Sequence, residues 1–308
     1  MGYNIMINLT KEALDRLYKK QKTMLSAGWI IIIAVFILSE AARQALDDVI
    51  ADRVLLNMII LIIDILPFLY IGYTMKKLIP SGNSRLAKKA YRVLQQDFMS
   101  ESSVEMLYRF IGQAGKYPEK VRLTLFLADI QAIRGNINEA LQFLYSVDRS
   151  GFEQYPDIGM LFYTEIIEIY SQLEDYDSVL RAYADGESFI DRAAEKNYTC
   201  CITAFGAMIN VEKARGNYRK ALDLRLIKNE YENLFNSTTG ASQQGTPLNR
   251  LLKGTVFMET AELFYLCGDL ESAGKYLDIG GPMLSASPYQ TKIANKLSAK
   301  IREAMAQR

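Results

Sequence analysis

The chain has 308 residues, of which 50% are hydrophobic and 23% are charged, with 36 basic and 35 acidic side chains. This near balance argues against a nucleic-acid-binding domain, which is usually strongly basic. The sequence contains no histidine, which excludes histidine-based catalytic triads, histidine general bases and histidine-ligated zinc.

Residues 1–24 form a leader, in which Asn8–Lys22 has the pattern of a short amphipathic helix. Leu9, Ala13 and Leu17 recur at helical spacing within it. Its lysines would favour the anionic headgroups of a lipid bilayer. We therefore expect the leader to lie close to a membrane.

Two strongly apolar runs follow and predict a transmembrane hairpin over residues 25–76. The first predicted span covers about 25–42 and the second covers 54–75, each close to the roughly 20 residues that a helix needs to cross a bilayer. A secretory signal peptide cleaved near Ser39 is the alternative for the first run. A long leader with acidic residues, followed by a second span, argues against cleavage.

Basic residues are concentrated on both sides of the predicted hairpin. Only Arg43 and Arg53 lie in the loop between the spans, whereas basic residues cluster before the first span and after the second (Lys11, Arg16, Lys19, Lys20 and Lys22, then Lys76, Lys77, Arg85, Lys88, Lys89 and Arg92). The positive-inside rule then predicts that both termini are cytoplasmic. We expect an integral membrane protein, of the plasma membrane in a bacterial cell.

Asp64 is the charged residue of the second predicted span, and Asn57 lies on about the same helical face. A charged aspartate at the bilayer centre costs about 2.5–3.5 kcal/mol on insertion scales. Asp64 is therefore expected to be protonated or turned toward protein. The favoured interpretation is a polar contact within the hairpin or between copies of the chain in a homo-oligomer. A proton- or ligand-binding role is the alternative.

After a linker at residues 79–84, the sequence predicts a helical domain over residues 84–308 that contains internal repeats. Four segments share an apolar helix, a Gly or Glu followed by Asn or Asp, and a small or apolar residue further on. Their turns are Gly135-Asn136, Glu174-Asp175, Gly216-Asn217 and Gly268-Asp269. Glycine ends a helix in the left-handed conformation, and Asn or Asp caps the next helix. The pattern predicts four helix–turn–helix units.

These segments resemble tetratricopeptide (TPR) repeats over about residues 118–280. Gly216–Leu222 carries the resemblance best, and Ala128 and Ala261 occupy the small position of the first helix. Ile167 and Ile209 depart from it, and the turns lie 39, 42 and 52 residues apart rather than about 34. The resemblance implies an all-α fold, an α-solenoid closed by capping helices at its ends.

The resemblance also implies a concave groove, lined by the first helix of each unit, that binds a protein or peptide partner. Aligned on the turns, the groove positions are Arg122, Asp129, Glu168, Gln172, Asn210, Lys213, Glu262 and Tyr265. The acidic residues Asp129, Glu168 and Glu262 favour a basic or mixed partner. Ordinary solvated helix faces are the alternative interpretation of each position.

No catalytic motif stands out, because Gly112–Tyr117 lacks the glycine spacing of a phosphate-binding loop. Cys200, Cys201 and Cys267 have no metal-ligand spacing and are expected to be reduced thiols. We therefore expect a non-enzymatic scaffold or adaptor, tethered to the membrane, that needs no cofactor or metal. The alternative is a small membrane sensor or transport-complex subunit in which the hairpin and Asp64 act.

Overall fold

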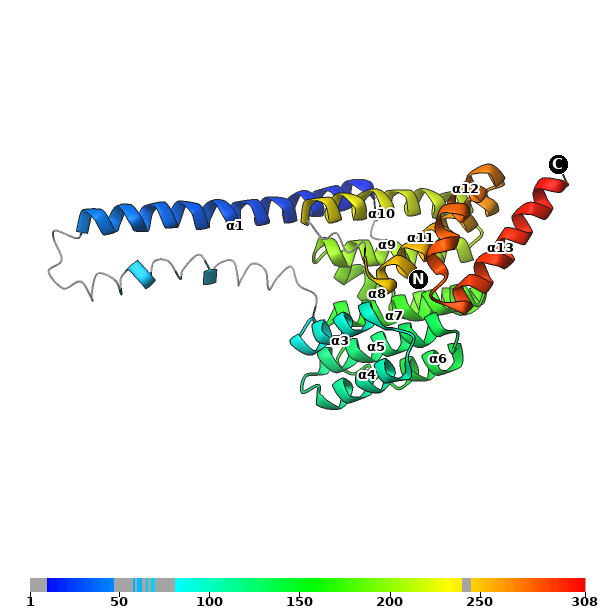
Figure 1. Ribbon diagram of the computed structural model, residues 1–308, viewed down its shortest axis with the longest axis horizontal. Coiled ribbons are helices and arrows are strands. Elements are labelled where there is room, and N and C mark those ends of the chain that lie inside the picture. The colour runs from blue at the N-terminus through cyan, green and yellow to red at the C-terminus, as the bar shows by residue number, and fades with distance from the viewer. Residues whose placement is uncertain are drawn as a thin grey trace, which may run out of the picture. The chain divides into compact units, whose positions relative to one another are not determined.

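The computed structural model describes residues 10–46, scattered residues between 58 and 69, and residues 81–239 and 245–307. Regular secondary structure in these residues is entirely helical, as the sequence predicts (Figure 1). The chain divides into two units. One comprises residues 8–80 with Asn197–Thr199, and the other, the helical domain, comprises Ser81–Lys196 and Cys200–Arg308.

The N-terminal unit contains helix α1 (Lys11–Leu46), which is long and apolar enough to cross a membrane. Thr10 begins it by accepting a hydrogen bond from the Ala13 amide at 3.2 Å. Trp29, Phe36 and Leu38 are each more than 60% exposed, as lipid-facing side chains would be. From Lys11 onward, the predicted leader and the first predicted span thus form one continuous helix rather than two elements. Asn57, Asp64 and most of the second predicted span lie outside the described residues.

The helical domain begins with α3 (Arg85–Gln96) and α4 (Glu101–Gln113) and continues as successive helix pairs. The pairs are α5 (Tyr117–Arg134) with α6 (Ile137–Tyr145), α7 (Pro156–Gln172) with α8 (Tyr176–Ala194), α9 (Tyr198–Ala214) with α10 (Tyr218–Thr239), and α11 (Pro247–Leu266) with α12 (Leu270–Gly280). A 3-10 turn, η1 (Gly281–Leu284), and α13 (Pro288–Ala306) complete the domain. The arrangement is that of helical repeats.

The turns inside the four pairs share one backbone geometry. The residues Gly135, Glu174, Gly216 and Gly268 all have positive φ angles, between 59° and 88°. In each turn this residue donates to the carbonyl three positions back, and the next residue donates to the carbonyl five positions back. This is the Schellman ending of a helix. The turns therefore lie at the predicted residues.

The polar residues after these turns act in two different ways. Asp175 and Asp269 cap the next helix by accepting from the amides of Ser178 and Ser272, at 3.1 and 3.0 Å. Asn136 makes no capping bond, so its predicted role as a cap is wrong. Its side-chain amide instead donates to Gln131 Oε1 at 2.9 Å. The amide turns back because the last turn of the preceding helix offers it a side-chain acceptor.

Small and branched residues allow the paired helices to approach closely. The residue one turn into each second helix has no exposed surface (Ala140, Val179, Ala221 and Ala273), and Ala128, Ile167 and Ala261 of the first helices have none either. Isoleucine at position 167 is buried as completely as alanine at the equivalent positions. The departure from the small-residue pattern therefore does not break the packing of the pair.

The beginning and the end of the helical domain pack against each other. Helix α11 contacts α3, and α13 contacts α5. Tyr91 Oη donates to Asn249 Oδ1 at 3.1 Å, and Ser287 Oγ donates to the Ile133 carbonyl at 2.7 Å. Leu251 joins the core cluster that α3, α4 and α5 form. The terminal helices thus pack against repeats far away in the sequence, and the repeat array closes on itself.

Two glycine-to-alanine substitutions should have opposite effects, because Gly216 lies in a left-handed turn whereas Gly206 lies inside a helix. A Cβ at Gly216 would meet nothing within 4 Å, so Gly216→Ala should destabilise by about 1 kcal/mol through backbone strain alone. Gly206 lies inside α9, where a Cβ would reach only Lys228 at 3.7 Å. Gly206→Ala should therefore stabilise by about 0.5–1 kcal/mol. Urea unfolding of the full chain in detergent, followed by circular dichroism, measures both.

A third substitution tests the closure of the domain. A Cβ at Gly135 would lie 2.9 Å from the Tyr289 ring of α13, so Gly135→Ala should cost clearly more than Gly216→Ala. Equal losses at the two positions would contradict the packing of α13 against the end of α5.

Candidate functional site

A narrow pocket of about 90 Å³ lies among α7, α9, α10, α11 and α13. Its lining includes many of the groove positions that the sequence predicts: Glu168, Gln172, Asn210, Lys213 and Glu262. These residues come from three helix pairs, and the structure brings them into one site. We refer to it as the Glu168 pocket.

The remaining predicted positions lie elsewhere. Arg122 lines a different pocket, between α3 and α5. Asp129 does not line the Glu168 pocket, although its charge acts on Glu165 and Glu168. Tyr265 packs against the apolar cluster of α11, α12 and α13. Alignment on the turns therefore selects five residues that line this pocket and three that do not.

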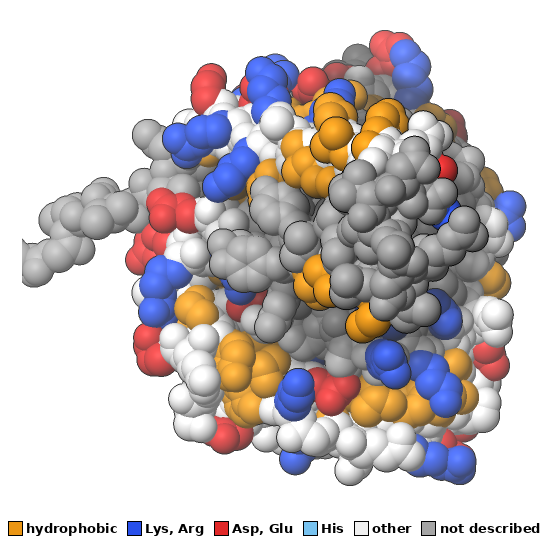
Figure 2. Space-filling model, turned by 90° about the vertical axis from the view of Figure 1, so that its left-hand side faces the viewer, with side chains coloured by type: hydrophobic (Ala, Val, Ile, Leu, Met, Phe, Trp, Pro, Cys, Tyr) orange, Lys and Arg blue, Asp and Glu red, His pale blue; other side chains and the backbone are white. Residues whose placement is uncertain are grey.

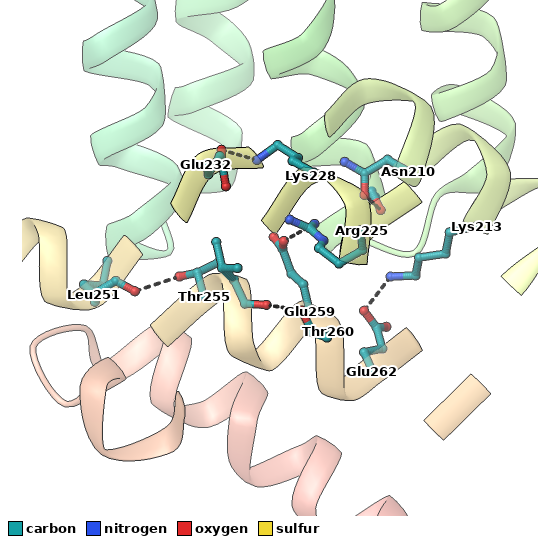
Figure 3. Close-up of polar contacts among 12 residues, drawn as sticks. Asn210, Lys213, Arg225, Lys228, Glu232, Leu251, Thr255, Glu259, Thr260 and Glu262 are labelled. Carbon is teal, nitrogen blue, oxygen red and sulfur yellow. Dashed lines mark hydrogen bonds and ion pairs between the residues drawn. The ribbon is translucent and has the colours of Figure 1, made fainter. Parts of the chain in front are cut away.

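Two ion pairs tie α11 to the helices before it (Figure 3). Lys213 Nζ of α9 donates to Glu262 Oε2 at 2.7 Å, and Arg225 Nη2 of α10 donates to Glu259 Oε2. The side chains of Lys213 and Arg225 are only 8% and 5% exposed. Breaking such a buried pair leaves a charge without compensation, so the pairs hold the pocket walls in place.

Lys213 remains charged in spite of its burial. Burial by itself lowers the pKa of Lys213, but the charge of Glu262 and its hydrogen bond outweigh burial and raise the pKa. A carboxylate at Glu262 and an ammonium at Lys213 therefore neutralise each other. Neither is left to attract a ligand.

Glu168 has no such partner, because within the described residues it forms no ion pair and no hydrogen bond. Burial, together with the charges of Glu259 and Asp129, raises the pKa of Glu168 to about 8, although Arg225 and Lys228 act in the opposite direction. Lys228 pairs with Glu232 on its own helix at 2.7 Å. A carboxyl group in this position is stabilised by any additional positive charge.

Two further carboxyl groups lie beside Glu168. Burial, with Asp129 and Glu168, raises the pKa of Glu165 well above its ordinary value, and burial raises that of Asp129 to about 6. Sequence reasoning missed Glu165, because alignment on the turns selects only every fourth position of α7. Its spacing could have identified it, because Glu165 lies three residues before Glu168 on α7 and residues three apart share a helix face.

Uncompensated hydrogen-bond acceptors also line the pocket. Gln172 Oε1 and Gln290 Oε1 are buried and have no partner among the described residues, and Gln290 is only 2% exposed. Ser171 Oγ donates to Asn210 Oδ1 at 3.0 Å, which occupies that amide oxygen. Sequence reasoning missed Gln290, because α13 was expected to cap the end of the array. The pocket therefore presents acceptors that would suit a ligand rich in donors.

Within the part of the chain that the structure describes, no three Cys, Asp or Glu side chains are grouped to hold a metal ion. No family model, curated protein or solved structure matches this chain. The interpretation of the site therefore rests on its own geometry. The chemistry that its residues offer is charge recognition and hydrogen bonding.

The pKa of Glu168 predicts a stability difference that depends on pH. In the folded protein this pKa is raised from 4.5 to about 8, so the folded state binds a proton more readily than the unfolded state. The contribution of Glu168 is fully present below about pH 4.5 and is lost as the pH rises toward 8. Glu168→Gln cannot ionise, so it should raise the melting temperature by about 2–4 °C at pH 8 and change it little at pH 4.5.

Thermal unfolding of the full chain in detergent at the two pH values measures this difference. Glu139→Gln, an exposed substitution on α6, is the matched control and should change the melting temperature little at either pH. A lower melting temperature for Glu168→Gln at pH 8 would show that the Glu168 carboxylate is stabilised rather than repelled by its surroundings.

Proposed function

We propose that this protein is a membrane-tethered, TPR-like scaffold or adaptor that binds a basic segment of a partner protein in the Glu168 pocket. The observation that carries the proposal is the Glu168 carboxyl group, unpaired within the described residues, in one pocket with two buried amide oxygens that have no donor there. The protein would act by binding and positioning its partner rather than by catalysis.

A lysine or arginine side chain matches what the pocket lacks. Lys213 and Arg225 already compensate Glu262 and Glu259, and Lys296 and Lys300 lie beside Glu174. Glu168 forms no ion pair within the described residues, and a bound cation would favour its carboxylate form over the protonated form that burial favours. A cationic side chain could donate to Glu168 and to Gln172 or Gln290 at the same time. Charge-assisted hydrogen bonds of this kind are about twice as strong as neutral ones. A pocket of about 90 Å³ suits one inserted side chain of a larger partner.

The repeat and membrane parts of the proposal have separate support. The four Schellman turns and the buried small residues are the features that TPR-like pairs need. Helix α1 is long and apolar enough to cross a bilayer, and the apolar run at residues 54–75 with its basic flanks favours a hairpin. In this arrangement both termini, and the helical domain with them, lie on the cytoplasmic side.

Charge reversal in the pocket tests the binding function. Crosslinking in cells followed by purification of the tagged full chain from membranes should recover a reproducible partner with the wild type. Glu168→Lys should reduce its recovery at least tenfold, because it places a positive charge where the partner's cation binds. Glu139→Lys, on the exposed surface of α6, should leave recovery unchanged. Equal recovery with both variants would contradict binding at Glu168.

Reporter fusions test the membrane topology. A reporter that is active only outside the cytoplasm should be inactive when fused after Arg308 and active when inserted after Asp47 in the predicted loop. A reporter that fluoresces only in the cytoplasm should give the reverse pattern. Activity of the first reporter at both positions would place both on the same side of the membrane, so residues 54–75 would not span it and the hairpin would be excluded.

A further inference from the structure

A second pocket, separate from the Glu168 pocket, lies between α3 and α5 and has a volume of about 500 Å³. This volume is typical of sites for small molecules. Its charged lining is entirely basic and comes from Lys88, Arg92 and Arg122, while Asn83, Tyr91 and Gln95 add polar groups. We refer to it as the Arg122 pocket.

Arg122 is the most constrained of the three cations. Its Nε is buried and has no hydrogen-bond partner within the described residues, where the guanidinium also forms no ion pair. The guanidinium lies over the Phe126 ring, 5.4 Å from its centroid. Burial lowers the pKa of Arg122, although the charge of Asp157 acts in the opposite direction. An arginine in this state lacks the anion that would normally compensate it.

Asp157 does not fill that role, because other groups occupy its carboxylate. It accepts hydrogen bonds from the Ser81 amide, from Ser81 Oγ at 3.1 Å and from Lys196 Nζ at 3.1 Å. Asp157 is only 1% exposed. These contacts fix the carboxylate at the first turn of α7, so Arg122 remains open to a ligand from outside.

Lys88 and Arg92 are placed to contact the same ligand, because both line the pocket. They lie four residues apart on α3 and therefore on one face of that helix. Ser84 caps α3 by accepting from the Ala87 amide at 3.1 Å, and the Tyr91 contact with Asn249 holds its middle. The neighbouring Lys89 does not line the pocket and instead lies over the Phe110 ring, 5.4 Å from its centroid.

The described part of the face in Figure 2 carries no single broad basic patch. On the described part of the face in Figure 2, basic and acidic side chains are interspersed, with hydrophobic side chains between them. A broad basic surface would attract any polyanion, whereas three cations that line one pocket suit a compact anionic group. The planar guanidinium of arginine binds two phosphate oxygens at once, and lysine adds a point charge.

We propose that the Arg122 pocket binds a phosphate group, carried either by a membrane lipid headgroup or by a soluble phosphate compound. The shared chemistry is a phosphate monoester or diester held by Arg122, Lys88 and Arg92. The lipid source is consistent with the sequence, because α3 closely follows the second predicted span and basic clusters next to spans attract anionic lipids.

Two measurements on the full chain in neutral detergent distinguish the sources. Native mass spectrometry with mixed micelles of phosphatidic acid and phosphatidylcholine reports on lipid retention, and calorimetric titration with inorganic phosphate reports on the soluble group. Retention of phosphatidic acid without phosphate binding assigns the pocket to a headgroup. Phosphate binding without lipid retention assigns it to a soluble compound. Absence of both overturns the proposal.

Substitutions decide whether the observed binding occurs in this pocket. Lys88→Gln and Arg92→Gln should each weaken binding about tenfold, the loss expected for one charge-assisted contact. Lys89→Gln, which removes the same charge one residue away, should leave the affinity unchanged. Arg122→Gln should abolish binding. Since Lys88 and Arg92 are exposed, their variants remain informative if Arg122→Gln does not fold. Equal losses for Lys88→Gln and Lys89→Gln would overturn the proposal.

Discussion

The left-handed turn that joins the helices of each pair determines most of the architecture of the domain. In each of the four turns, one residue with positive φ allows two backbone amides to satisfy the last carbonyls of the preceding helix. The chain then reverses within a few residues, so the second helix must pack against the first. Because the turns repeat with the same hydrogen bonds, the first helices of successive pairs present their polar residues toward one region. The Glu168 pocket is a consequence of this repetition.

The charged groups of the Glu168 pocket are not all paired. Lys213 and Arg225 form ion pairs, whereas Glu168 forms none within the described residues. Arg225 and Lys213 each pair with a carboxylate of α11, and these contacts join α11 to the preceding pair. The carboxyl groups of α5 and α7 receive no such partner, so burial raises the pKa values of Asp129, Glu165 and Glu168. A domain selected for stability alone would lose little by replacing them with neutral residues. Of the three, only Glu168 lines the pocket with the free acceptors, and the proposed binding function would account for a carboxyl group at that position.

The sequence predicts the local features of this fold well and the distant contacts poorly. The turns at Gly135, Glu174, Gly216 and Gly268 follow from residue types only a few positions apart, so a single sequence contains the necessary information. The closure of the domain depends on Tyr91 with Asn249 and on Ser287 with Ile133, which are separated by 158 and 154 residues. No periodicity encodes such pairs.

The same distinction applies to the site itself. Glu168 and Lys213 were predicted because repeat register places them on inward faces. Gln290 was missed because its position depends on the return of α13 toward α5. Arg122 was assigned to the groove by register, but the contacts of α3 with α5 place it in a different pocket.

The two pockets differ in their charged lining, because the Arg122 pocket is lined by cations alone whereas glutamates and cations together line the Glu168 pocket. Anionic headgroups attract cations, so a basic partner segment tends to be drawn to the same bilayer surface as the basic residues of the protein. A buried carboxylate with fixed acceptors competes with that surface through directed hydrogen bonds, which a fluid layer of headgroups does not provide. In the Glu168 pocket, Lys213 and Arg225 are already paired with carboxylates of α11, whereas Arg122 forms no ion pair among the described residues. The proposed phosphate group is therefore expected in the Arg122 pocket rather than in the Glu168 pocket.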